Sequence, residues 1–171
     1  MMALVVTQAV SAATKQPNVI VVFIDDLGWT DLGCYGSKFY ETPHIDQLAK
    51  QGVMFTRAYS SCNVCSPTRA SLMTGKYPQR VGFTSWLNPG KISGANSAAT
   101  HLPASETTIG EAFQQAGYRT GYIGKWHLGK KDGGWPEDQG FDENKIYDPN
   151  HLFYEYEHVN SGPNKFLENK E

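Results

Sequence analysis

The sequence predicts an α/β fold in which a mostly parallel, mixed sheet is flanked by helices. Three observations support this prediction: an apolar β-branched run at residues 18–24, two segments in which a strand-like pattern follows a helical one, and a hydrophobic content of 40%. An apolar run without polar alternation is typical of a strand buried on both faces, as in parallel sheets. Strands that alternate with helices along one chain indicate the α/β class. A chain of 171 residues is also long enough to bury a core.

The first half of the chain is expected to hold two strands and two helices. Residues 18–24 are the first strand. A helix follows, with Thr42 as its N-cap, Pro43 at its first position and Gly52 at the C′ position just after its end. Residues 53–55 then form a short apolar strand. A second helix is expected over residues 67–74, because a proline opens this segment and a glycine follows it.

The second half repeats the helix–strand unit. Thr108 and Glu111 match the pattern of a capping box, so we expect a helix to begin there and a strand to follow at residues 118–123. Residues 84–104 are polar and small and are expected to form a long loop. From residue 130 to residue 171 the pattern weakens and no closing element is evident, so we expect the sheet to be incomplete at the C-terminus.

Charge and cysteine content exclude several classes of protein. A net charge of −2 provides no basic surface for nucleic acid or an anionic membrane, and three cysteines are too few for a disulfide scaffold. No apolar segment approaches the roughly 20 residues of a membrane-spanning helix. Residues 1–16 resemble the later part of a secretory signal peptide, although the positively charged start is missing. We therefore expect an exported protein, in the periplasm, the medium or a lysosome-like lumen; a frayed start is the alternative.

Two adjacent acids, Asp25 and Asp26, follow the first expected strand. Open α/β sheets bind ligands beside the carboxyl ends of their strands. Neighbouring carboxylates repel one another unless a cation neutralises them, and oxygen ligands suit calcium or magnesium. The pair is a candidate metal site; a solvated turn in which one aspartate caps the following residues is the alternative.

The segment Cys65-Ser66-Pro67-Thr68-Arg69 places a cysteine just before a helix. The N–H groups and dipole of a helix N-terminus favour anions and make such a thiol more reactive. Arg69, one turn later, is suited to hold an oxyanion through two parallel hydrogen bonds. Cys62 and Cys65 also match a C-x-x-C pattern, which leaves open a redox pair or, with Cys34 and a histidine, a zinc site. A buried structural thiol is the remaining alternative.

Lys125 and His127 follow the strand expected at residues 118–123. If the chain stays extended, both side chains point to the same side of the sheet, at the edge that also carries the acid pair. Lysine supplies a positive charge, and histidine exchanges a proton near neutral pH. A solvated lysine and a histidine at the edge of the core are the alternative.

Taken together, these segments resemble the sulfatase family. Residues 65–75 are similar to the first signature of that family, C-x-P-x-R followed by leucine or methionine, threonine and glycine, and residues 117–129 are similar to its second signature. The first strand with its acid pair matches as well, as do residues 42–46 and 140–142. The resemblance covers about residues 17–142, and two long motifs in the right order make it specific.

The resemblance implies an alkaline-phosphatase-like α/β fold and hydrolysis of a sulfate monoester. In this family a separate maturation enzyme oxidises the cysteine at the position of Cys65 to formylglycine, an aldehyde whose hydrate attacks sulfur. The resemblance further implies one divalent cation, calcium, bound by Asp25, Asp26 and the modified Cys65.

The same resemblance assigns roles to three cationic side chains. Arg69 would hold the nucleophile, Lys125 would bind the sulfate, and His127 would hydrogen-bond the nucleophile and help to break down the intermediate. The implied partners are a sulfate-ester small molecule or a sulfated glycan and the maturation enzyme, with no nucleic acid and no membrane span.

The chain departs from the family in length. Family members have several hundred residues, and later residues, including an Asp-Asn pair, complete their site. Asp148-Pro149-Asn150 does not supply that pair, because a proline separates the two residues. We therefore expect residues 17–171 to be the N-terminal part of a sulfatase catalytic domain with an incomplete site. A non-catalytic remnant or binding module is the second hypothesis. A phosphatase or phosphonate-ester hydrolase is the third, and the C-x-P-x-R run argues against it.

Overall fold

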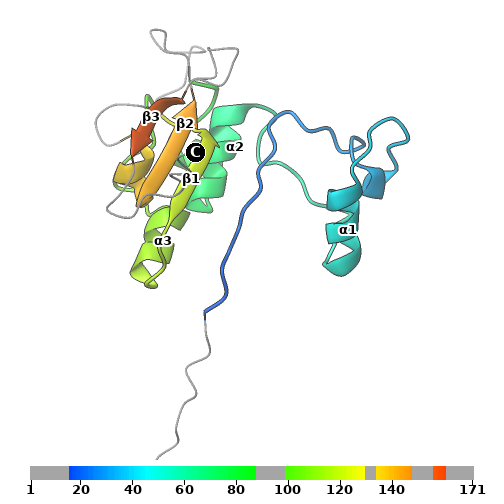
Figure 1. Cartoon of the computed structure of the whole chain (residues 1–171). Coiled ribbons are helices and arrows are strands. Elements are labelled where there is room, and N and C mark those ends of the chain that lie inside the picture. The colour runs from blue at the N-terminus through cyan, green and yellow to red at the C-terminus, as the bar shows by residue number, and fades with distance from the viewer. Residues whose placement is uncertain (1–15, 88–98, 130–133, 148–155, 161–171) are drawn as a thin grey trace, which may run out of the picture. The chain divides into compact units, whose positions relative to one another are not determined.

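The structure is a computed structural model of the chain, and it describes residues 16–87, 99–129, 134–147 and 156–160. The chain divides into two compact units, residues 1–54 and residues 55–171, and each is described by itself (Figure 1). None of the helices in the described ranges is both long enough and apolar enough to cross a bilayer.

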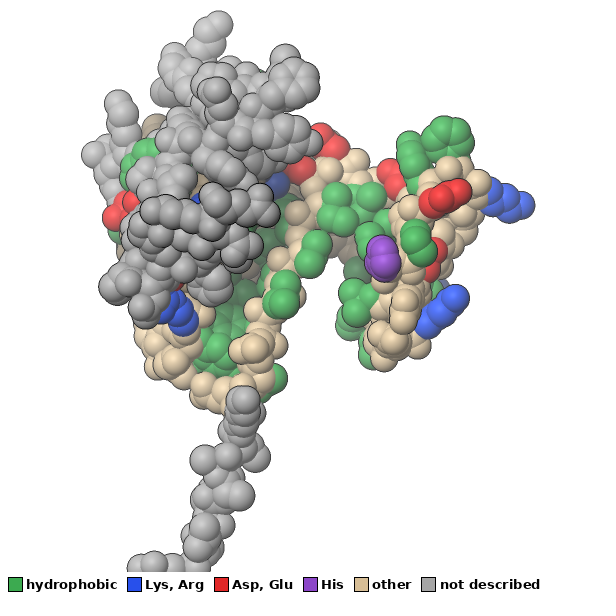
Figure 2. Space-filling view, viewed as in Figure 1, with side chains coloured by type: hydrophobic (Ala, Val, Ile, Leu, Met, Phe, Trp, Pro, Cys, Tyr) green, Lys and Arg blue, Asp and Glu red, His purple; other side chains and the backbone are tan. Residues whose placement is uncertain are grey.

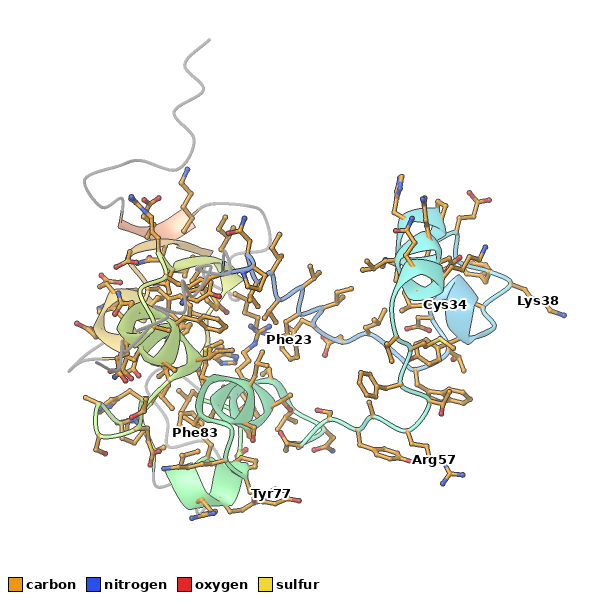
Figure 3. The ribbon with its side chains drawn as sticks, turned by 90° about the horizontal axis from the view of Figure 1, so that it is seen from below. Phe23, Cys34, Lys38, Arg57, Tyr77 and Phe83 are labelled. Atoms are coloured by element: carbon orange, nitrogen blue, oxygen red, sulfur yellow. The ribbon has the colours of Figure 1, made fainter. Side chains whose placement is uncertain are left out.

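The first unit is built around α1 (Pro43–Gln51) and the short 3-10 helix η1 (Gly33–Tyr35). The helix expected here is confirmed, but Thr42 does not cap it through its side chain. Its hydroxyl instead donates to Asp46 over 2.9 Å, and the backbone N–H of Cys34, labelled in Figure 3, donates to the same carboxylate over 2.7 Å. Desolvation tends to raise the pKa of Asp46, but these hydrogen bonds outweigh it and the pKa is lowered. This carboxylate therefore joins η1 to the first turn of α1.

The strand expected at residues 18–24 is not formed. The segment is extended but belongs to no sheet, and its apolar side chains are open to solvent (Figure 2). Ile20 is 85% exposed and Val22 is 78% exposed. The short strand expected at residues 53–55 is also absent, and Val53 is 81% exposed. Both predictions were wrong because β-branched composition gives only a propensity, whereas a strand exists only where a neighbouring strand accepts and donates its backbone hydrogen bonds.

The second unit contains a three-stranded mixed sheet. Its strands are β1 (Gly121–Lys125), β2 (Glu143–Tyr147) and β3 (Tyr156–Asn160), in the order β1-β2-β3. β1 and β2 are parallel, and β2 and β3 are antiparallel. The mixed sheet is confirmed. β1 is the strand expected at residues 118–123, but it begins later, at Gly121, and ends later, at Lys125.

Strand β2 lies in a region for which no strand was expected. Two of its five residues, Glu143 and Asn144, are polar and yet buried. Glu143 is paired with Arg119, and the amide of Asn144 donates to Glu137 over 2.8 Å. These partners account for the Glu143 carboxylate and the Asn144 amide N–H, whereas the amide oxygen of Asn144 is buried without a hydrogen-bond partner among the described residues. With two buried polar residues, the strand has no apolar pattern from which it could have been predicted.

Four helical segments accompany the sheet: α2 (Cys65–Thr74), η2 (Pro78–Val81), α3 (Ile109–Gln115) and η3 (Pro136–Gln139). Figures 1 and 3 show α2 and α3 on the same side of the sheet. α2 begins two residues earlier than expected, with Cys65 inside its first turn, and ends at Gly75 with a left-handed φ of 66°. The capping box of α3 is confirmed, because Thr108 and Glu111 bond reciprocally to each other's backbone N–H.

The buried core lies entirely in the second unit, where α2, the sheet and the connecting loops meet. Its apolar members are Ala70, Met73, Val81, Phe83, Leu102, Trp126, Leu128, Phe141 and Ile146. The ring of Trp126 contacts those of Tyr122 and Phe141 edge to face, with ring centroids 4.9 and 6.1 Å apart. The described parts of the loop expected at residues 84–104 contain neither helix nor strand, and residues 88–98 lie outside the described residues.

A polar clamp fixes the starts of β1 and β2 beside each other. The backbone N–H of Thr120 donates to the carboxylate of Asp142 over 2.8 Å, and the Thr120 hydroxyl donates to the carbonyl of Gly140 over 2.7 Å. The hydrogen bond from the Thr120 backbone is the main reason that the pKa of Asp142 is lowered. The register that follows pairs Gly121 with Glu143 and brings the carboxyl ends of both strands to one edge.

Candidate active site

The residues singled out from the sequence fall in both units. Asp25 and Asp26 belong to the first unit, whereas the cysteine and the cationic residues belong to the second. Within the second unit, α2 and the end of β1 bring two pairs into direct contact: Cys65 with His127, and Arg69 with the backbone of Lys125.

The thiol of Cys65 and the imidazole of His127 form the centre of the site. Their Sγ and Nδ1 atoms lie 3.2 Å apart, although 62 positions separate the two residues in the chain. Both side chains are half-buried. A sulfur this close to a ring nitrogen can hand its proton to that nitrogen, so the pair can generate or stabilise a nucleophile at position 65.

The backbone at His127 has a conformation that the sequence did not predict. Extension does not continue past β1, because His127 has a left-handed φ of 57°. Its two neighbours, Trp126 and Leu128, are both buried in the core, and the indole N–H of Trp126 donates to the carbonyl of Gly134 over 2.7 Å. These anchors hold a backbone conformation that is unfavourable for a non-glycine residue, which is common at functional sites.

The second ring nitrogen of His127 is also held. Its Nε2 lies 2.7 Å from the backbone carbonyl oxygen of Leu87. A carbonyl oxygen only accepts hydrogen bonds, so Nε2 carries the hydrogen and donates it. In a neutral imidazole, Nδ1 is then an acceptor, and it is the atom that faces Cys65.

Arg69 lies almost entirely inside the protein, with 5% of its surface exposed. Its Nη1 donates to the backbone carbonyl of Lys125 over 2.5 Å and to the hydroxyl of Tyr122 over 3.3 Å. The Tyr122 hydroxyl itself donates to the same carbonyl over 2.5 Å. The guanidinium is thereby oriented along the end of β1, one helical turn from Cys65.

Asp25 and Asp26 occupy a turn rather than the end of a strand. Asp25 is half-buried, and Asp26 is exposed with a left-handed φ of 57°. Adjacent carboxylate oxygens fit a hard divalent cation in kind. In the described ranges, no three His, Cys, Asp or Glu side chains cluster tightly enough to hold a metal ion.

The cysteines of the C-x-x-C pattern are free thiols, as is Cys34. The Cys62 thiol lies near the amide oxygen of Asn63, 3.7 Å away, whereas Cys65 is directed to His127. The thiol of Cys65 therefore has a different polar neighbour from that of Cys62.

Three contributors to the site were not assigned a role from the sequence: Ser66, Tyr122 and the carbonyl of Leu87. Ser66 and Tyr122 stand inside the two motifs, so the motifs themselves carried a signal. The contribution of Leu87 comes from its backbone, which any residue type provides, so no sequence pattern could have identified it.

Comparison with known proteins shows which family the chain resembles. A family model described as Sulfatase matches residues 17–166. The chain is 45% identical to human steryl-sulfatase over 122 residues, which is 71% of this chain and 21% of the relative. It is 43% identical to human arylsulfatase A over 132 residues, 76% of this chain and 25% of the relative. The chain therefore spans about a fifth to a quarter of the length of these relatives.

Solved structures show the same likeness. A crystal structure of Ps i-CgsB matches with a TM-score of 0.65 and 39% identity, over 72% of this chain and 26% of that one. A structure of BT4656 in complex with its substrate, D-glucosamine-2-N,6-O-disulfate, matches with a TM-score of 0.56 and 32% identity, over 71% of this chain and 21% of that one. The α/β fold class expected from the sequence is confirmed by these neighbours.

Proposed function

The chain belongs to the sulfatase family, and from this premise we propose that residues 17–171 are the N-terminal part of a catalytic domain that hydrolyses sulfate monoesters. The contact between Cys65 and His127 is the observation that carries the proposal. A redox pair would instead direct the thiol toward another thiol.

In the proposed reaction, a separate maturation enzyme oxidises Cys65 to formylglycine, and water adds to this aldehyde to give a geminal diol. One hydroxyl of the diol attacks sulfur and expels the alcohol of the ester, and the second hydroxyl then expels sulfate and restores the aldehyde. The Sγ atom of the unmodified residue stands in for an oxygen of that group. Nδ1 of His127, 3.2 Å from Sγ, accepts a proton from the group at position 65 and returns it later.

Cationic groups at the site would neutralise the negative charge of the sulfate group. The sulfur of a sulfate ester is surrounded by negatively charged oxygens, so a nucleophile reaches it only where cationic groups neutralise them. Arg69 is held beside the start of α2, whose first N–H groups favour anions, and we propose that Lys125 binds the sulfate.

A divalent cation would complete this charge. We propose that Asp25, Asp26 and the modified Cys65 hold calcium, because adjacent carboxylates provide the oxygen ligands that this ion prefers. Bound there, the cation would supply further neutralisation of the sulfate and lower the pKa of the attacking hydroxyl.

The names of the relatives support a proposal for the class of substrate. Steryl-sulfatase and arylsulfatase A are named for steryl and aryl sulfates, and BT4656 has a disulfated glucosamine as its substrate. We propose a small sulfate monoester or a sulfated glycan as substrate, and export of the protein to the periplasm, the medium or a lysosome-like lumen.

Mass spectrometry tests the modification on which the proposal depends. Trypsin cleaves after Arg57 and Arg69 and releases a peptide that contains both Cys62 and Cys65. After co-expression with a formylglycine-generating enzyme, we expect this peptide to carry one aldehyde. The aldehyde should persist in Cys62→Ala and vanish in Cys65→Ala. An intact thiol at Cys65 after co-expression would overturn the proposal.

An assay with a chromogenic aryl sulfate tests catalysis. With the rest of the catalytic domain present, we expect the aldehyde-carrying protein to show calcium-dependent turnover that drops by roughly 10³-fold or more in Cys65→Ala and stays unchanged in Cys62→Ala. Metal-dependent turnover by these 171 residues alone would refute the alternative that they are a non-catalytic remnant. Faster hydrolysis of the matching aryl phosphate would assign them to a phosphatase instead.

A further inference from the structure

We propose that Ser66 is a positioning residue that fixes, through the backbone of Leu87, which ring nitrogen of His127 carries the hydrogen. The proton arrangement follows from the geometry of the described residues, and its value for catalysis rests on the proposed function. Ser66 lies next to Cys65 on α2, so the same helix that presents the nucleophile would also prepare its proton acceptor.

The first step is the contact between His127 and Leu87. Nε2 lies 2.7 Å from the Leu87 carbonyl oxygen, which has no hydrogen to give. The neutral ring therefore holds its hydrogen on Nε2 and leaves the lone pair of Nδ1 directed at Cys65, 3.2 Å away. In the other tautomer, the lone pair of Nε2 would face the Leu87 carbonyl oxygen, so that two acceptors would meet. Nδ1 would then carry the hydrogen and could not accept a proton from the group at position 65.

The second step is the contact between Leu87 and Ser66. The backbone N–H of Leu87 donates to the Ser66 hydroxyl oxygen over 3.0 Å. Ser66 is completely buried, and Leu87 packs against the core. The Leu87 backbone therefore bonds to Ser66 through its N–H and to His127 through its carbonyl. A shift of Leu87 would change both hydrogen bonds together.

The third step concerns the other side of the ring. The backbone of His127 cannot follow a displaced Leu87, because Trp126 and Leu128 are buried on either side of it. The carbonyl of Leu128 also accepts a hydrogen bond from the N–H of Leu102 over 2.7 Å. The distance from His127 to Leu87 therefore depends on what holds Leu87, and the described contact that does so through a side chain is Ser66.

The proposal gives Ser66 a role distinct from packing. With Nδ1 free of hydrogen, His127 can accept a proton from the group at position 65. With the hydrogen on Nδ1, the ring could only donate to that group, and the proton transfer of the proposed reaction would begin from the wrong state.

Nitrogen-15 NMR of the histidine ring tests the proposal without turnover. A Cys65→Ser background keeps a hydrogen-bonding group at position 65, cannot ionise near neutral pH and cannot mature. The pH is raised until the nitrogen-15 shifts of the ring stop changing, so that only the neutral form is observed. The resonances of His127 are identified by their loss in His127→Gln. We expect the hydrogen on Nε2, and a ring with its hydrogen mainly on Nδ1 would overturn the proposal.

Variants of Ser66 then test its part in this arrangement. Ser66→Ala should reduce the preference for the Nε2–H tautomer by roughly tenfold, since one hydrogen bond in the chain of contacts is lost. Ser66→Thr keeps the hydroxyl and should restore the preference. Ser71→Ala removes a serine hydroxyl from the same helix that bonds to Lys76, and it should leave the tautomer unchanged.

The outcomes separate this inference from the proposed function. A Ser66→Ala chain that keeps the wild-type tautomer would overturn the positioning role even if sulfate esters are hydrolysed. A shifted tautomer would support the role even in a chain without turnover. An equal shift in Ser71→Ala would show a general effect on α2 and would also overturn the assignment to Ser66.

Discussion

The guanidinium of Arg69 donates to the backbone carbonyl of Lys125 over 2.5 Å, so the first motif is joined to the end of the strand that carries the second. The contact uses the main-chain carbonyl of Lys125 rather than its ammonium group. It also fixes the spacing between α2 and β1, on which the distance between Cys65 and His127 depends. The two motifs therefore form one structural unit.

Arg69→Lys should destabilise the second unit. An ammonium group replaces the planar guanidinium and cannot reproduce both of its contacts, with the Lys125 carbonyl and the Tyr122 hydroxyl. We expect the free energy of unfolding in urea to fall by about 1.5–3 kcal/mol, the range for hydrogen bonds to charged groups. Arg80→Lys, an exposed change of the same kind, is the control and should have little effect. Equal losses in both variants would contradict the interpretation.

Tyr122→Phe isolates the hydroxyl from the aromatic ring. The ring keeps its edge-to-face contacts with Trp126 and Phe141. The hydroxyl's donation to the Lys125 carbonyl is removed, together with its weaker acceptance from Arg69 over 3.3 Å. Because Arg69 still satisfies that carbonyl, we expect a loss of about 1 kcal/mol in unfolding free energy. Tyr77→Phe, at an exposed tyrosine, provides the comparison. A loss as large as that of a core truncation would show that the hydroxyl has another function.

Two glycines with the same backbone conformation should tolerate alanine differently. Gly140 and Gly117 both have a φ of 84°. A Cβ at Gly140 would lie 2.2 Å from the backbone nitrogen of Glu111, whereas a Cβ at Gly117 would meet nothing within 4 Å. Gly117→Ala should cost about 1 kcal/mol, the price of left-handed backbone alone. Gly140→Ala should cost at least about 2 kcal/mol more in the same urea titration, because α3 must move. Similar losses would rule out the close approach.

The carboxylate of Asp142 should make stability depend on pH at the acidic end. Hydrogen bonding from Thr120 lowers its pKa in the folded chain relative to the unfolded chain. The resulting stabilisation is complete above the unfolded pKa and is lost as the pH falls through the folded pKa. Asp142→Asn should therefore cost more stability at pH 6 than at pH 3, with thermal unfolding as the measurement. Glu41→Gln, a carboxylate-to-amide change on the surface, serves as control. A pH-independent cost for Asp142→Asn would contradict this account.

Local signals in the sequence predicted those parts of the fold that depend on local contacts. The capping box of Thr108 and Glu111, the proline that opens α1 and the glycine after α2 each act within one helical turn, and the helices formed where expected. The strands depended on partners far along the chain. Residues 18–24 have the composition of a strand without a pairing neighbour in the described chain, whereas β2 is paired and buried despite polar residues.

The candidate site divides in the same way. The motifs identified Cys65, Arg69 and His127, because their residue types determine their chemistry, and the structure brings the cysteine and histidine into contact. The left-handed turn at His127 was not predicted, since the buried residues that hold it come from several segments. The role of the Leu87 carbonyl could not have been predicted either, because a backbone group leaves no trace in residue identity.

The open, uncharged segment at residues 18–24 has a consequence for handling the protein in solution. Six of its seven residues are hydrophobic, it contains no proline, and its side chains face the solvent. Short segments of this kind, from many copies of a chain, can pair as stacked β-strands with interdigitated side chains and form amyloid-like fibrils at high protein concentration. Storage life at high concentration should therefore be governed by these few residues, and a single lysine placed at Val21 should prolong it.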